Sequence, residues 1–331
     1  MPVLRVFVLC GLVALAAAAP AHGAEDRASF SVLVENDSFG GTDRHYTNGL
    51  KASWLSKKGG IKGLSRWLAR ALPLFPKDGD RRIGFAVGQN IYSPADLSAT
   101  TLQTEDRPYA GWLYGELGLT AQTRNRLDSV ALSLGVIGPA SQADDVQKAW
   151  HRLFNITRPR GWEHQLNNEP ALNISYQHRR RYFRENTPFF GLDADVMPHL
   201  GLSLGNVFTY GAAGLTVRFG DDFAGDFGGP PRIRPSMPGA GHFQSPASGF
   251  GWYLFAGIEG RAVARNIFLD GNTFTDSHSV DKKTFVGDAQ LGFALIFRRF
   301  RITYTQVLRT FEFDGQATPH TFGAISLTAN F

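Results

Sequence analysis

His320-Thr-Phe-Gly-Ala-Ile-Ser-Leu-Thr-Ala-Asn-Phe331, the last stretch of the chain, alternates between two kinds of side chain. Small or apolar residues fall on one face, namely Gly323, Ile325, Leu327, Ala329 and Phe331, and polar residues fall on the other, namely Ser326, Thr328 and Asn330. A period of two predicts a β-strand. In a soluble sandwich this would be an apolar edge strand, which invites aggregation in water. A strand of a membrane barrel, whose apolar face meets lipid, is the favoured interpretation.

Similar alternation recurs along the whole chain. It begins with Phe30, Val32 and Val34 and returns at residues 50–54. Further runs cover 82–91, 109–121, 127–137, 171–179, 191–205, 210–219, 250–264, 284–297, 300–309 and 320–331. These twelve candidates make an even number, as in single-chain bacterial outer-membrane barrels, which also commonly end on an aromatic residue such as Phe331. We therefore predict an all-β fold, a 12-stranded antiparallel transmembrane β-barrel.

The N-terminus has the pattern of a secretory signal. Arg5 precedes an apolar run over residues 6–19, and Ala-His-Gly-Ala at 21–24 supplies small residues for cleavage. We predict a signal peptide over 1–24 and one barrel domain over 25–331, located in the bacterial outer membrane. Cys10, the single cysteine, lies inside the predicted signal, so the mature chain would have neither a disulfide nor a thiolate nucleophile.

Composition agrees with a barrel. No second apolar stretch approaches the ~20 residues that a spanning helix requires. Aromatic residues make up 12% of the chain, charged residues only 19%, and there are 37 glycines. The formal net charge of +5 suits an anionic lipid surface better than nucleic acid, which this compartment rarely offers. We expect no nucleic-acid partner and no obligate protein partner.

Two connections interrupt the strand pattern. Residues 61–75 predict an amphipathic helix packed at one end of the barrel. Residues 220–248 are rich in Gly and Pro and predict an irregular loop, for which the sequence indicates no function.

Polar residues gather at one rim of the predicted barrel. With a periplasmic N-terminus, the ends of odd strands and the starts of even strands lie on the extracellular side. Asn36, Asp37, His45, Tyr46 and Thr47 fall there, and so do Gln89, Tyr92, Asp106, Arg107 and the connection 138–169. A structural protein has no reason to concentrate its most polar stretches on one rim, so a functional site is expected there.

A short helix is predicted inside this extracellular connection. Ser141 would cap it, Asp144 and Asp145 would occupy its first turn, and Val146, Trp150 and Leu153 would form its apolar stripe. Gln147 and His151, four residues apart, would be neighbours on the flank of that stripe. His151 could act as a general base near neutral pH, or it could be a partly buried packing residue.

Asn36-Asp37 also has two interpretations. Side-chain oxygens at a strand end can ligate a hard cation such as calcium, and the same dipeptide is ordinary turn chemistry. The common hydrolase motifs Gly-x-Ser-x-Gly and His-Glu-x-x-His are absent from the sequence.

Several ordered motifs resemble the lipid A 3'-O-deacylase (LpxR-type) family of outer-membrane β-barrels. They are Glu35-Asn-Asp-Ser-Phe39, Asp43-Arg-His-Tyr-Thr-Asn-Gly-Leu50, Gln89-Asn-Ile-Tyr-Ser-Pro94, Asp106-Arg-Pro-Tyr-Ala-Gly111, Gly135-Val-Ile-Gly-Pro139, Gln147-x-x-x-His151 and Gly161-Trp-Glu-His-Gln-Leu166. The resemblance implies an enzyme that hydrolyses the 3'-linked acyloxyacyl ester of lipid A in lipopolysaccharide, with calcium.

The resemblance also implies roles for individual residues. His151 would activate water with Gln147 beside it, and Asn36, Asp37 and Thr47 would form the metal and oxyanion region. This combination is chemically coherent, because ester attack builds negative charge that a cation stabilises.

Two departures from the family pattern affect the remaining roles. Residues 95–105 lack the lysine that the family carries there, so Arg107, with Tyr92 and Asp106 nearby, is expected to contact the substrate. The first acid after His151 is Glu163, which is expected to join Asp37 and Thr47 at the metal.

Two other functions remain open at this point. The same water-activating site could act on another outer-leaflet ester, such as a phospholipid. Alternatively, the protein could be a non-catalytic barrel, either a pore or a membrane-stabilising protein, because the sequence does not show whether the lumen is filled.

Overall fold

The structure, a computed structural model, describes residues 26–40, 45–60, 63, 75–155, 157–184, 191–237 and 239–331. Within these ranges the chain forms a single sheet whose strands are β1 (Ser29–Asn36), β2 (His45–Leu55), β3 (Asp80–Ser93), β4 (Ala110–Gln122), β5 (Arg126–Ile137), β6 (Glu169–Arg180), β7 (Tyr182–Arg184), β8 (Asp193–Gly205), β9 (Phe208–Asp221), β10 (Phe250–Asn266), β11 (Phe285–Phe297), β12 (Phe300–Arg309) and β13 (His320–Asn330). The helices are η2 (Asp37–Gly40), η3 (Pro139–Ser141), α3 (Ala143–Phe154), η4 (Trp162–His164) and α4 (Ile267–Asp270).

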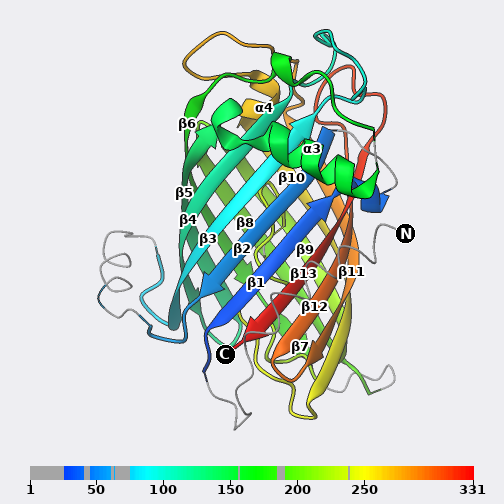
Figure 1. Ribbon diagram of the computed structural model, residues 1–331. Helices are drawn as coiled ribbons and strands as arrows, with labels where there is room; N and C mark the ends of the chain where they lie inside the picture. The colour runs from blue at the N-terminus through cyan, green and yellow to red at the C-terminus, as the bar shows by residue number, and fades with distance from the viewer. Residues whose placement is uncertain are drawn as a thin grey trace.

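The sheet closes on itself as a barrel (Figure 1). Each strand pairs antiparallel with its neighbours, and β1 pairs with β13. The short β7 continues β6, since both pair with β8. Counted as one strand, they make the barrel wall twelve-stranded. This confirms the predicted 12-stranded antiparallel barrel.

The terminal strand has the predicted facing. Ser31 of β1 lies opposite Thr328 of β13, and their hydroxyl oxygens are 2.8 Å apart inside the barrel. Ser326, Thr328 and Asn330 are all buried, whereas Phe331 is exposed. Because side chains alternate along a strand, the small and apolar set of β13 faces outward.

The outer face of the wall is apolar. Leu254 and Ile258 of β10, Leu200 and Leu202 of β8, and Val87 of β3 are exposed. In water such a surface would be unfavourable, but against lipid it is the expected face of a membrane barrel. No helix within the described residues is long and apolar enough to cross a membrane.

The two ends of the barrel differ. The helices α3 and α4 lie at the end drawn uppermost, and the C-terminus lies at the opposite end (Figure 1). We call these ends the upper and the lower rim. The connections β1–β2, β3–β4 and β5–β6, which hold the predicted site residues, all belong to the upper rim, because antiparallel strands return every second connection to the same end.

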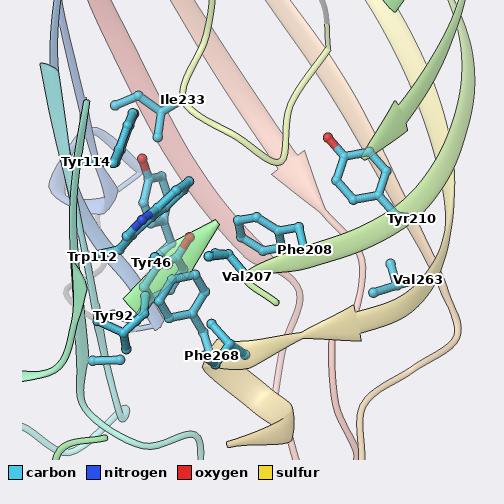
Figure 2. Close-up of a cluster of buried hydrophobic side chains, with 14 of the residues drawn as sticks. Tyr46, Tyr92, Trp112, Tyr114, Val207, Phe208, Tyr210, Ile233, Val263 and Phe268 are labelled. Atoms are coloured by element: carbon cyan, nitrogen blue, oxygen red, sulfur yellow. The ribbon is translucent and has the colours of Figure 1, made fainter. Parts of the chain in front are cut away.

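An aromatic cluster fills the upper lumen (Figure 2). Tyr92 stacks on Phe268 of α4 with ring centroids 3.8 Å apart, and Trp112 and Phe208 close around the same ring. Tyr46 donates a 2.9 Å hydrogen bond to Glu35 within this cluster. The packed rings leave the upper lumen occupied by protein.

The connection between β9 and β10 fills the lower lumen and reaches up to the aromatic cluster, to which it contributes Ile233. It contains turns, bends and an isolated bridge, as predicted for the segment 220–248, but it folds into the barrel. Asp226, fully buried, pairs with Arg301 at 2.7 Å, and Arg232 pairs with Glu35 at 2.6 Å. Buried charges are tolerated when paired, so these contacts hold the segment against the inner wall.

Two sequence predictions lie outside the described residues. These are the signal peptide over 1–24 and nearly all of the amphipathic helix over 61–75. Both stay predictions.

Candidate active site

Two predicted site residues, Asn36 and Thr47, meet Ser93 on the outer face of the barrel wall. Glu35 points into the lumen, so Asn36, the next residue on β1, points outward. Its amide nitrogen donates to Thr47 O at 2.9 Å, and Thr47 Oγ1 lies 2.5 Å from Ser93 Oγ. All three side chains are buried even though they lie on the lipid side of the barrel.

Helix α3 lies across the outer wall near this cluster (Figure 1). At its start, Gln89 of β3 donates a 2.6 Å hydrogen bond to Ser141 O. Gly111 of β4 faces the same turn, and a Cβ there would overlap Ser141 Oγ and Ala143 Cβ. The missing side chain of Gly111 therefore lets the connection lie directly on the wall.

The predicted cap of α3 is wrong. Ser141 ends the preceding turn η3, and its hydroxyl donates to Gly138 O at 2.6 Å. Gln142 occupies the cap position in a left-handed conformation and makes no side-chain cap bond. Asp144 is in the first turn as expected and pairs with Lys148 at 2.8 Å.

The buried face of α3 is not its apolar stripe. Val146 and Leu153, predicted for the apolar stripe, are 40% and 49% exposed. Gln147 and His151 are each only 1% exposed and, with Ala143, form the face turned to the barrel. Because lipid lies outside the wall, this helix reverses the usual arrangement and presents its polar face to protein.

The contact of His151 with the backbone sets its tautomer. Its Nδ1 hydrogen-bonds to the carbonyl oxygen of Thr157. A carbonyl oxygen can only accept, so Nδ1 carries the proton, and the neutral tautomer consistent with this contact has its lone pair on Nε2. This is the arrangement that a general base requires.

Gln147 is oriented by an indole. Trp162 Nε1 donates to Gln147 Oε1 at 2.8 Å, and because an indole only donates, the amide oxygen must be the atom that faces it. Gln147 Nε2 is buried and has no hydrogen-bond partner among the described residues. An unsatisfied buried donor costs about 1–3 kcal/mol, so this group is suited to an oxygen of a bound molecule.

Tyr92 and Arg107, predicted to contact the substrate, lie on the lumenal side of the wall. Arg107 is fully buried and pairs with Glu312 at 3.0 Å, above the Tyr92 ring. Burial would raise the pKa of the Glu312 carboxyl, but Arg107 and Arg309 beside it hold that pKa below its ordinary value. The structure thus does not bring Tyr92 and Arg107 together with His151.

Asp106 organises the loop that follows β3. Its carboxylate accepts hydrogen bonds from the backbone of Ala95 at 2.8 Å and of Arg107 at 2.7 Å. His45 Nδ1 lies 3.7 Å from the same carboxylate. These contacts give Asp106 a role in shaping the rim, and its predicted role in substrate binding stays a prediction.

The residues predicted to hold calcium fall into two groups. Asp37 is buried beside Asn36, and Thr47 contributes a hydroxyl to the same cluster, so their oxygen donors fit a hard cation in type. Glu163 is apart from them: its side chain is 69% exposed and lies 3.5 Å from His164. Among the described residues, no cluster of three or more His, Cys, Asp or Glu has the arrangement of a metal site.

Two contributors were not assigned from the sequence. Ser93 bonds Thr47 because the β2–β3 register pairs its strand end with the start of β2, a relation that strand pairing could have indicated. Trp162 orients Gln147 across fifteen residues of irregular chain, and no local pattern signals that contact.

Comparison with known proteins places this chain in a family. The family model described as Outer membrane protein LpxR matches residues 6–331. Among solved structures, LpxR from Salmonella typhimurium matches with a TM-score of 0.72 and 21% identity, covering 92% of this chain and 100% of that chain.

The β domain of the Bordetella autotransporter BrkA matches with a TM-score of 0.44 and 9% identity, covering 92% of this chain and 99% of that chain. A comparison with curated protein sequences finds no match. Because the family model spans nearly the whole chain, this protein belongs to the LpxR family of outer-membrane proteins.

Proposed function

We propose that this protein is a lipid A 3'-O-deacylase that uses His151 as the base. The observation that carries the proposal is the burial of Gln147 and His151 between α3 and the lipid-facing wall. A catalytic pair on the lipid-facing side of the barrel suits an ester in a lipid. The upper rim would be the extracellular one, which brings the pair to the outer leaflet.

The residues support direct attack by water. Because Thr157 O holds the proton on Nδ1, Nε2 of His151 can take a proton from water as its oxygen bonds to the ester carbonyl carbon. The carbonyl oxygen becomes negative, and Gln147 Nε2 is a buried donor able to stabilise that charge with a hydrogen bond. The bond to the sugar oxygen then breaks, and the proton on Nε2 passes to that leaving oxygen. The products are a free fatty acid and a sugar hydroxyl.

Calcium would be held by Asp37 and Thr47, with Asn36 beside them, and when bound it would supply positive charge for the oxyanion. Glu163 as a third ligand rests on the sequence alone. The donor types at Asp37 and Thr47 suit calcium, a hard cation that prefers oxygen ligands.

Other lipid esters are a second possible substrate class for the same site, since the roles of His151 and Gln147 involve only water and the ester group and do not include recognition of the sugar. A pore is not supported, because the aromatic cluster and the segment 222–249 fill the lumen. Choice of the 3'-linked acyloxyacyl group rests on the family to which the chain belongs.

Mass spectrometry of lipid A from cells expressing the protein tests the proposal. Wild type should remove the 3'-linked acyloxyacyl group, and His151→Ala should leave lipid A intact. His178→Ala, at the lower rim, is the matched control and should behave as wild type. Intact lipid A with folded wild-type barrel and calcium present would refute the deacylase, and fatty-acid release from phospholipid vesicles would then indicate the other ester.

A further inference from the structure

The surface of α3 that faces away from the barrel carries an apolar stripe. Val146 and Leu153 are largely exposed, and Trp150 between them is partly exposed. These positions recur at helical spacing, so they form one stripe. A helix in water would turn such a stripe toward the protein, whereas here Gln147 and His151 occupy the protein-facing side. The stripe is therefore placed for contact with lipid.

The height of α3 on the wall agrees with this placement. Phe85 and Val87 on the outer face of β3 are 44% and 61% exposed and belong to the apolar belt. Gln89, the next outward residue on that strand, already bonds the turn that begins α3. The helix thus lies at the upper edge of the belt, where acyl chains give way to headgroups.

A group of exposed arginines accompanies the stripe. Arg152, Arg158 and Arg160 are exposed, and none of them forms an ion pair with an acid in the described part of the chain. The neighbouring acidic side chains have other partners: Asp144 pairs with Lys148, and Glu163 lies against His164. Asp145, also exposed, is in the first turn of α3, almost two turns from Arg152. The C-terminal end of the helix and the segment after it are therefore positive.

Two contacts attach this positive segment to the proposed site. Thr157, the residue before Arg158, holds His151 Nδ1 through its carbonyl oxygen. The backbone of Arg160 donates to Leu97 O at 2.9 Å, which ties the segment to the β3–β4 loop. The arginines therefore flank the histidine at headgroup height.

We propose that the stripe and the three arginines form a docking surface for phosphate-bearing lipid headgroups of the outer leaflet. The stripe seats α3 at the acyl boundary, and the arginines bind the phosphates of the substrate headgroup. Guanidinium groups bind phosphate in a bidentate manner, and each basic residue at an anionic surface adds to attraction. That this surface binds the substrate rests on the proposed function, whereas its binding of phosphate-bearing headgroups does not.

The test measures binding of fluorescent lipid A to folded full-length barrel in detergent, in a His151→Ala background so that no turnover intervenes. One series uses lipid A with both phosphates and the other uses dephosphorylated lipid A. We compare Arg152→Gln/Arg158→Gln/Arg160→Gln with a matched triple variant at the lower rim, Arg124→Gln/Arg180→Gln/Arg298→Gln, whose side chains are also exposed.

The α3 variant should bind phosphorylated lipid A about tenfold more weakly. This is less than the full attraction that three exposed basic residues would contribute at an anionic surface. It should bind the dephosphorylated form as the lower-rim variant does. Equal binding of phosphorylated lipid A by both triple variants would overturn the docking surface. Normal phosphate-dependent binding without hydrolysis by wild type would instead overturn only the proposed function.

Discussion

Trp162 Nε1 donates a 2.8 Å hydrogen bond to Gln147 Oε1, and this contact determines which end of the Gln147 amide faces the rest of the site. The donor nitrogen is left for another acceptor, since no described residue bonds it. The arrangement suggests that the role of Trp162 is to present Gln147 Nε2 as an oxyanion donor.

Replacing Gln147 removes the proposed donor. Gln147→Ala should lower kcat about a hundredfold, the usual cost of losing one oxyanion-hole donor. KM should change little, because the negative charge develops only during the reaction. Steady-state kinetics on purified lipid A measure both constants. A raised KM with normal kcat would mean that Gln147 binds the substrate in its ground state and does not act as the oxyanion donor.

Replacing the indole tests orientation separately from donation. Trp162→Phe keeps the packing against Tyr109 but lets the Gln147 amide rotate. We expect kcat to fall about fivefold, in line with a net hydrogen-bond contribution near 1 kcal/mol. In Gln147→Ala the same change should have no further effect, and an additive double variant would contradict the coupling.

The seat of α3 on the wall depends on Gly111. Gly111→Val should push Ser141 and Ala143 away and abolish turnover while the barrel still folds, as judged by its gel mobility without heating. Gly115→Val is the matched control, because it lies on the same face of β4 and a Cβ there meets nothing. Wild-type activity of Gly111→Val would show that the position of α3 is unimportant.

Calcium should act through the Asp37 cluster. Chelation is expected to reduce turnover, and calcium should restore it better than magnesium, which demands stricter octahedral geometry. Asp37→Asn should require more calcium for half-maximal activity, since one negative ligand is lost. Full activity of wild type in chelator would remove calcium from the proposal.

The lumenal segment should contribute stability and not turnover. Asp226→Asn leaves Arg301 buried with a weakened partner, and breaking a buried pair costs about 3–5 kcal/mol. The free energy of unfolding in urea should fall accordingly, while kcat stays normal because Asp226 lies near the lower rim. Asp221→Asn, an exposed neighbour, should change neither quantity.

The barrel could be predicted because the alternation of side chains has a period of two within each strand and does not depend on the connections between strands. Residues such as Ser326 and Thr328 already separated the lumenal face of the last strand from its apolar face. Residues 220–248 were predicted to be irregular, but the place of this segment inside the lumen depends on contacts such as Asp226 with Arg301, more than seventy residues apart. Such long-range pairs leave no local pattern.

The site was only partly predictable. Strand ends placed Asn36 and Thr47 at one rim, where strand pairing brings them together, whereas their role at the site was implied by the family resemblance alone. The apolar stripe of α3 could be predicted but not the direction in which it faces, because the rule that such a stripe faces protein assumes water outside, and here the outside is lipid. Arg107 was expected near the substrate, yet the course of its loop brings it to Glu312 in the lumen.

The central claim is that water activated by His151 attacks the acyl carbonyl of lipid A. Hydrolysis of purified lipid A by the folded barrel in ¹⁸O-labelled water tests it most directly. One labelled oxygen should appear in the carboxyl of the released fatty acid and none in the sugar hydroxyl, and His151→Ala should release no fatty acid. Label in the sugar hydroxyl, or undiminished release by His151→Ala, would contradict the account.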